Sequence, residues 1–313
     1  MDPGLLSQRN DLQNRAMSRR FLLAPLALAW LVGCASFPRR LEHTTVRSSA
    51  LRDTYAEYAV YVPPDFTQDE RLPLVLFLHG GGDGPDCFDR HGISERLDAG
   101  MRDGSIPRAV IAIPQGDLGF WANWYDGSRS YEDWAVDEVL PRVARRHHTQ
   151  ACPEGCHLMG ISMGAEGAIR IALHRPGAFA SVTSISGPSM DTERRIAFTN
   201  DRLVSAFVPT LHVFGPTEPR TRVERDDPFV QWRTPDALGR TRLMIAWGTS
   251  DRDLVREGGE ALRAHLEGHG VPHVAHVFDG GHDWTSWAPV IEEALRVQLG
   301  AGQLQQAQIT PRQ

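Results

Sequence analysis

A serine stands between glycines in the stretch GISMG, in which Gly160 precedes and Gly164 follows Ser162. The apolar residues before this stretch predict a buried strand, and the run AEGAIRIAL after it predicts a helix. A serine at a sharp turn from strand to helix projects its hydroxyl from the edge of a sheet, which suits a nucleophile. The pattern therefore predicts nucleophilic catalysis at Ser162. The alternative is an ordinary glycine-rich loop, because G-x-S-x-G is a short motif.

A nucleophilic serine needs a general base and an acid that orients the base. His282 lies in FDGGHDW, on a glycine turn that follows the last predicted strand. Asp251 follows the preceding predicted strand in LMIAWGTSD, and Asp253 two residues further on is the second choice. The order serine, acid, histidine along the chain is the order found when the serine occupies such a turn. We expect Ser162, Asp251 and His282 to form a catalytic triad.

An oxyanion formed during acyl transfer needs backbone N–H donors. The stretch LHGGGDG follows an early buried strand, and its glycines let the backbone approach a substrate closely. We expect the N–H groups of Gly81 and Met163 to form the oxyanion hole, with His79 bracing the loop. The alternative for the three glycines is a flexible loop.

The elements that position these residues alternate between apolar strands and amphipathic helices. This order predicts a doubly wound, mostly parallel sheet with helices on both faces. We place the catalytic domain at residues 53–299, a polar tether at 35–52 and a flexible tail at 300–313. Residues 188–239 are less regular and rich in Pro, Arg and Asp, which indicates a lid or a specificity insert.

Aromatic residues gather after one predicted strand in FWANWYDGS and again beside His282. They either line the substrate pocket or pack the core beneath the insert. The pocket candidates are Trp121, Trp124, Tyr125 and Trp284.

The beginning of the sequence has the pattern of an export signal. In MSRRFLLAPLALAWLVGC two arginines precede an apolar run that is too short to span a bilayer comfortably. We expect translation to start at Met17 and a signal segment 1–34 to end in a lipobox, with cleavage before Cys34 and lipid on its thiol. By analogy with lipoprotein sorting, Ala35 directly after this cysteine favours the outer membrane over retention in the inner membrane. An ordinary N-terminal anchor or an uncleaved signal is the alternative.

The charge of the chain argues against a nucleic-acid partner. The net charge is −6, and removal of residues 1–33, which carry four arginines and two aspartates, changes it to −8. An exported protein folds in an oxidising space, where Cys152 and Cys156 in CPEGC would form a disulfide and leave Cys87 unpaired. Three free thiols are the alternative. His265 and His269 stand one helical turn apart, but without an acidic partner we expect surface histidines and no metal site.

These motifs together resemble the esterase-D-type branch of the α/β-hydrolases, which includes S-formylglutathione hydrolases, feruloyl esterases and mycolyltransferases. The similarity rests on LFLHGGG, GISMGAEGAIRIALHRPGAFASVTSISG, WGTSD and GGHDWTSW, and it spans residues 55–299. It implies an α/β-hydrolase fold and a serine esterase that forms an acyl-enzyme on a small ester substrate, without a cofactor or metal. An acyltransferase with the same triad and a non-catalytic surface lipoprotein are the alternatives.

Overall fold

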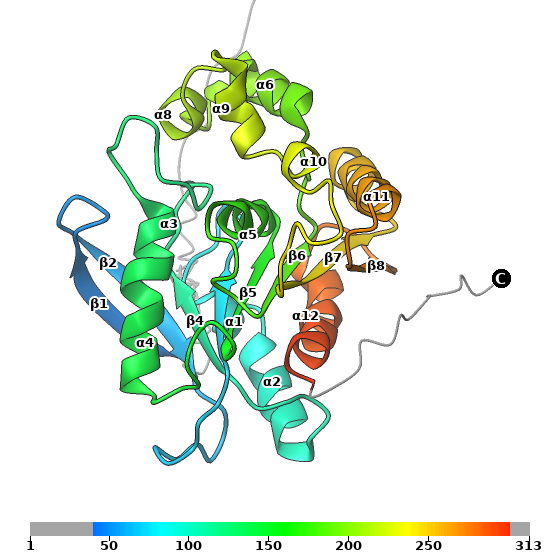
Figure 1. Ribbon diagram of the computed structural model, residues 1–313. Helices are drawn as coiled ribbons and strands as arrows, with labels where there is room; N and C mark the ends of the chain where they lie inside the picture. The colour runs from blue at the N-terminus through cyan, green and yellow to red at the C-terminus, as the bar shows by residue number, and fades with distance from the viewer. Residues whose placement is uncertain (1–39, 301–313) are drawn as a thin grey trace, which may run out of the picture. The chain divides into compact units, whose positions relative to one another are not determined.

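The computed structural model describes residues 40–300 (Figure 1). The predicted signal segment, the lipidation site Cys34 and the tail from residue 301 lie outside the described residues. None of the helices between residues 40 and 300 is both long and apolar enough to cross a membrane.

Eight strands between residues 40 and 300 form one sheet in the order β1-β2-β4-β3-β5-β6-β7-β8. β1 and β2 pair antiparallel, as do β2 and β4, and every other neighbouring pair is parallel. The strands are β1 Glu42–Ser48, β2 Thr54–Tyr61, β3 Leu74–Leu78, β4 Val110–Pro114, β5 Cys156–Ile161, β6 Ser181–Ile185, β7 Arg242–Gly248 and β8 Val274–Phe278.

Helices pack on both faces of this sheet, because the central strands are buried throughout and need an apolar cover on each side. One core cluster lies under α4, α5 and α11, and the other lies under α1, α2 and α12. The prediction of a doubly wound, mostly parallel sheet is therefore confirmed. The helices are α1 Cys87–Arg90, α2 Ile93–Asp103, α3 Tyr131–Asp133, a π-helix Trp134–Val139, α4 Leu140–Arg146, α5 Met163–His174, α11 Asp253–Gly268 and α12 Trp284–Leu299.

The carboxyl ends of the parallel strands meet at one edge of the sheet, which is where sites form in such folds. The residues that follow β3, β5, β6, β7 and β8 at this edge include Gly81, Ser162, Ser186, Asp251 and His282. The sheet thus brings Ser162 and His282, which are 120 positions apart in the sequence, to the same edge.

The irregular segment 188–239 is a helical insert between β6 and β7. In Figure 1 its helices α6, α8 and α9 lie above α5, at the edge of the sheet where the strands end. The insert helices are α6 Thr192–Asn200, α7 Arg202–Ser205, α8 Thr210–Phe214, α9 Arg220–Arg225 and α10 Pro228–Gln231.

The expected tether at 35–52 is wrong in its second half. Residues Glu42–Ser48 form β1 and pair along their whole length with β2. β1 lies at the edge of the sheet and exposes most of its side chains, so it lacks the apolar pattern by which strands are found.

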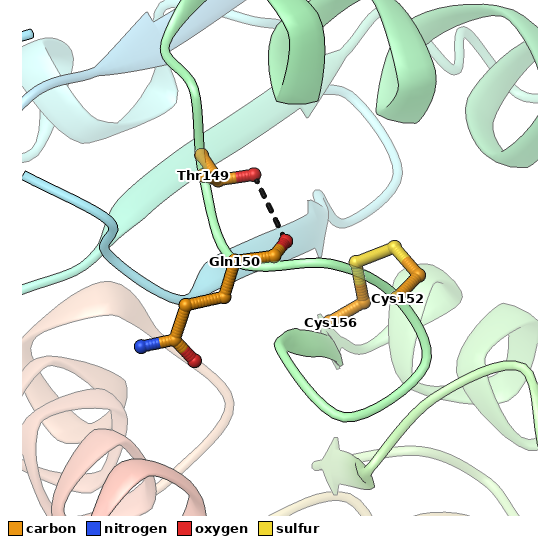
Figure 2. Close-up of a disulfide and its surroundings, with 4 residues drawn as sticks. All are labelled: Thr149, Gln150, Cys152 and Cys156. Carbon is orange, nitrogen blue, oxygen red and sulfur yellow. Dashed lines mark hydrogen bonds between the residues drawn. A yellow bond between two sulfur atoms is a disulfide. The ribbon is translucent and has the colours of Figure 1, made fainter.

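A disulfide joins Cys152 to Cys156 in the turn that leads into β5 (Figure 2). The structure thereby decides between the two alternatives for these cysteines. Cys156 is the first residue of β5 and is fully buried. Cys87 is free and buried in α1.

Candidate active site

Ser162 occupies the turn between β5 and α5 with a φ angle of 51° and a ψ angle of −115°. A non-glycine residue in this region is strained, and such strain persists where the surrounding structure fixes it. The two flanking glycines make the turn possible. A Cβ atom at Gly160 would collide with Gly164 O, and a Cβ atom at Gly164 would collide with Leu78 O. The sequence motif therefore reflects close packing of α5 against β5 and β3.

The three predicted triad residues form one hydrogen-bonded chain. Ser162 Oγ lies 2.8 Å from His282 Nε2, and His282 Nδ1 lies 2.7 Å from Asp251 Oδ1. Asp251 is 5% exposed, so its carboxylate interacts with the imidazole away from bulk water. The second candidate acid, Asp253, instead begins α11 and forms an ion pair with Arg256 on the surface.

Two further side chains hold the acid, and the sequence analysis missed both. Ser186 Oγ donates to Asp251 Oδ2 at 2.5 Å, and Trp287 Nε1 donates to Ser186 Oγ at 2.9 Å. Burial by itself raises the pKa of Asp251, but hydrogen bonds from His282, Ser186 and the Arg252 N–H outweigh it and lower the pKa overall. The sequence did contain a signal for Ser186, namely its position: it directly follows β6, at the same edge of the sheet as Ser162.

The two predicted oxyanion donors, Gly81 and Met163, both line the cavity beside Ser162. Within residues 40–300 neither N–H donates to an acceptor of the protein. Met163 is the first residue of α5, where backbone N–H groups lack partners within the helix. Two free N–H groups beside a serine hydroxyl are the kind of donors that an oxyanion requires.

His79 holds the glycine loop in place. Burial lowers the pKa of His79 and keeps its ring neutral. Its Nε2 accepts from the Gly116 N–H at 3.0 Å, and its Nδ1 donates to Gly80 O at 2.8 Å. The histidine thus fixes the loop to the backbone that follows β4, in agreement with the bracing role expected from the sequence.

Comparison with known proteins places the chain in a family. A model of the esterase family described as "Putative esterase" matches residues 48–297. The chain belongs to this family. An esterase of Mycobacterium tuberculosis is 30% identical over 243 residues, which cover 71% of this chain and 51% of the relative. The chain thus spans about half the length of this relative.

Solved structures show the same fold at low sequence identity. The fluorophosphonate-binding serine hydrolase F of Staphylococcus aureus is 19% identical with a TM-score of 0.67, over 83% of this chain and 98% of that one. A ferulic acid esterase is 19% identical with a TM-score of 0.66, over 82% of this chain and 96% of that one. The expected α/β-hydrolase fold is confirmed.

A cavity of about 640 Å³ opens beside Ser162, and its walls are mostly apolar. The insert contributes Met190, Phe198, Val204 and Val208. The body of the domain contributes Leu118, Phe120, Trp284 and Trp287. Because the insert forms one wall, the residues least regular in sequence shape the space around the nucleophile.

The aromatic residues predicted for the pocket divide into two groups. Trp284 lines the cavity, where its indole N–H donates to Asp83 and its ring stacks on His91. Trp121, Trp124 and Tyr125 are not among the lining residues, so the prediction was wrong for these three.

Each of the three aromatic residues has another role. Trp121 is fully buried against Gly167 of α5 and donates its N–H to His79 O. Trp124 packs beside Tyr131 and donates to Gly119 O. Tyr125 is 55% exposed and lies under the guanidinium of Arg222. The loop instead points Leu118 and Phe120 into the cavity, an orientation that a sequence pattern does not specify.

Proposed function

We propose that the protein is a carboxylic-ester hydrolase that works through an acyl-enzyme intermediate. The observation that supports this most strongly is the hydrogen-bonded chain from Ser162 through His282 to Asp251 at the mouth of an apolar cavity. Family membership points the same way. None of the observations favours an acyltransferase or a non-catalytic lipoprotein.

The geometry permits the following reaction. Ser162 Oγ attacks the ester carbonyl carbon while its proton passes to His282 Nε2. Asp251 stabilises the imidazolium that forms, and the N–H groups of Gly81 and Met163 hold the negative oxygen. His282 then protonates the leaving alcohol as the carbon–oxygen bond breaks. A water molecule attacks the acyl-enzyme in the same manner, and the acid leaves as Ser162 recovers its proton.

The walls of the cavity support an apolar acyl group. Phe120, Phe198 and Met190 offer aromatic and sulfur-containing surface without a charge, which suits an aliphatic or aromatic acyl chain. Charged groups lie around Trp284, where Asp83 contacts both its indole N–H and the ring of His91. We therefore assign the apolar wall to the acyl part of the ester and the Asp83 side to its alcohol part.

We further propose that the protein is exported and anchored by lipid at Cys34, in the outer membrane. The proposal rests on the sequence LVGC followed by Ala35. The disulfide between Cys152 and Cys156 supports it, since structural disulfides persist in oxidising compartments. Replacement of Cys34 by alanine should move the protein from the membrane fraction to the soluble fraction. Unchanged fractionation would contradict a lipid anchor at this residue.

The test of the catalytic proposal compares the wild type with Ser162→Ala on four esters. The substrates are p-nitrophenyl acetate, butyrate and octanoate, and methyl ferulate. We expect turnover by the wild type and a fall in kcat of roughly 10⁶ in the variant, because the triad acts as a unit. Fluorophosphonate labelling of the wild type alone would identify Ser162 as the reactive group. A loss of less than about tenfold would exclude Ser162 as the nucleophile.

A further inference from the structure

A second cavity, of about 500 Å³, lies between the insert and α5. It shares no lining residue with the catalytic cavity. α5 contributes Arg170 and His174, and the insert contributes residues of α6, α8 and α9, the helices above α5 in Figure 1. Glu166 stands between the two cavities, because it lines the catalytic cavity and its carboxylate contacts Arg170 and Arg195 of the second one.

Positive charge predominates in this second cavity. Five cationic side chains line it together with one carboxylate, and two more carboxylates lie behind the cations, so five positive groups face three negative ones. His174 counts as positive because hydrogen bonds with Asp226 and Glu132 outweigh its burial and raise its pKa to about 9. The cations are Arg170, His174, Arg195, Arg222 and Arg225, and the carboxylates are Asp226, Glu166 and Glu132.

One buried donor that lines the cavity has no acceptor among residues 40–300. It is the hydroxyl Oγ1 of Thr199, a residue that is 1% exposed. The two buried guanidinium groups are held by carboxylates, since Arg195 Nη1 lies 2.6 Å from Glu166 Oε1 and Arg170 Nε lies 3.5 Å from Asp226 Oδ2. Buried donors are nearly always paired, so the hydroxyl of Thr199 indicates a missing acceptor beside these cations.

We propose that this cavity binds a small organic oxyanion with at least two carboxylate or phosphate groups. Thr199 Oγ1 would donate to one group in the interior, beside the guanidinium of Arg195, and Arg222 would bind the other group near the surface. Leu173 and Phe214 provide apolar surface for the carbon skeleton between the groups. The overall net charge of −6 repels anions, so binding depends on this local cluster. The proposal does not rest on the esterase activity.

The bound anion would connect two parts of the fold. Arg195 and Thr199 belong to α6 of the insert, whereas Arg170 belongs to α5, which begins directly after Ser162. An anion held between them stabilises the packing of the insert on α5. The insert also supplies Phe198 and Val208 to the catalytic cavity, so the anion is expected to order the acyl wall.

Isothermal titration calorimetry of the full chain with citrate and with inorganic phosphate, at low ionic strength and against sodium chloride, tests the proposal. We expect one site per chain for at least one probe. Thr199→Val preserves the shape of the side chain and should weaken binding at least tenfold, as should Arg222→Gln. Arg240→Gln is the matched control, because Arg240 is exposed and pairs with Glu154 outside the cavity.

The outcomes are distinct. Binding of citrate alone assigns the site to polycarboxylates, and binding of phosphate alone assigns it to phosphorylated molecules. Circular dichroism shows whether each variant is folded. If Arg222→Gln is not folded, the binding measurement on Thr199→Val tests the proposal. The proposal is overturned if neither probe binds the wild type more tightly than chloride, or if Arg240→Gln weakens binding as much as Thr199→Val does.

Discussion

Ser186 donates a hydrogen bond to Asp251 through the carboxylate oxygen that does not contact His282. The same hydroxyl accepts from the indole of Trp287, at the beginning of α12. Side chains after β6, β7 and β8 are thereby joined into one network with α12. The orientation of the acid thus depends on residues outside the triad, in the way that a second layer of hydrogen bonds positions catalytic groups elsewhere.

Replacement of Ser186 by alanine should lower kcat for p-nitrophenyl butyrate by about tenfold with little change in KM. The variant loses the donor to Asp251 and the acceptor for Trp287, so the carboxylate is less well fixed and its pKa rises. Activity should therefore fall more steeply at low pH than in the wild type. Ser250→Ala is the control, because Ser250 is exposed beside the same loop. Equal kcat and an equal pH profile in Ser186→Ala and wild type would contradict the positioning role.

Replacement of Val208 by tryptophan should narrow the acyl side of the catalytic cavity. We expect kcat/KM for p-nitrophenyl octanoate to fall by at least about tenfold, while the value for the acetate ester changes by less than about threefold. Leu203→Trp adds the same ring at a position that is 78% exposed and does not line the cavity. Parallel losses on both esters would show that Val208 does not contact the acyl chain.

Removal of the disulfide by the double change Cys152→Ala and Cys156→Ala should lower the free energy of unfolding by about 2 kcal/mol, since the bond closes a short loop. For a domain of this size that corresponds to a fall in Tm of about 4–8 °C. Dithiothreitol should lower the Tm of the wild type by a similar amount and leave the double variant unchanged. An insensitive wild type would mean that the bond does not stabilise the fold.

His174 should make the stability of the fold depend on pH. Its pKa is about 9 when folded, against an ordinary value of 6.5, because it bonds with Asp226 and Glu132. A raised pKa means that the stabilisation is complete below pH 6.5 and is lost as the pH rises through 9. With allowance for partial exposure the contribution is about 2 kcal/mol.

Urea unfolding of wild type and His174→Gln at pH 6, 8 and 10 measures this contribution. The difference in unfolding free energy should be greatest at pH 6 and small at pH 10. His269→Gln is the control, because His269 is exposed just after α11 and contacts the carbonyl and the ring of His265, away from Asp226 and Glu132. A difference that is constant with pH would assign His174 a packing role instead.

The sequence predicts the hydrogen-bonded triad better than the residues around it, for a physical reason. Ser162 and His282 stand at fixed places relative to apolar strands, and a buried strand is visible in the sequence. The edge strand β1 is polar, and its formation depends on pairing with β2 rather than on its own pattern. Trp121 shows why the pocket residues were harder to predict. Its ring occupies space in the core that Gly167 of α5 leaves open, and this space exists only in the folded protein.

The helical insert has a consequence for how such enzymes diverge. The three residues of the proposed triad follow the ends of strands, whereas Phe198 and Val208 belong to a segment that leaves the sheet after β6 and returns to it at β7. A lineage can therefore exchange or lengthen residues 188–239 and acquire a new substrate preference while the reacting groups stay where they are. Selection for a different substrate and selection for the reaction itself therefore act on different parts of the gene.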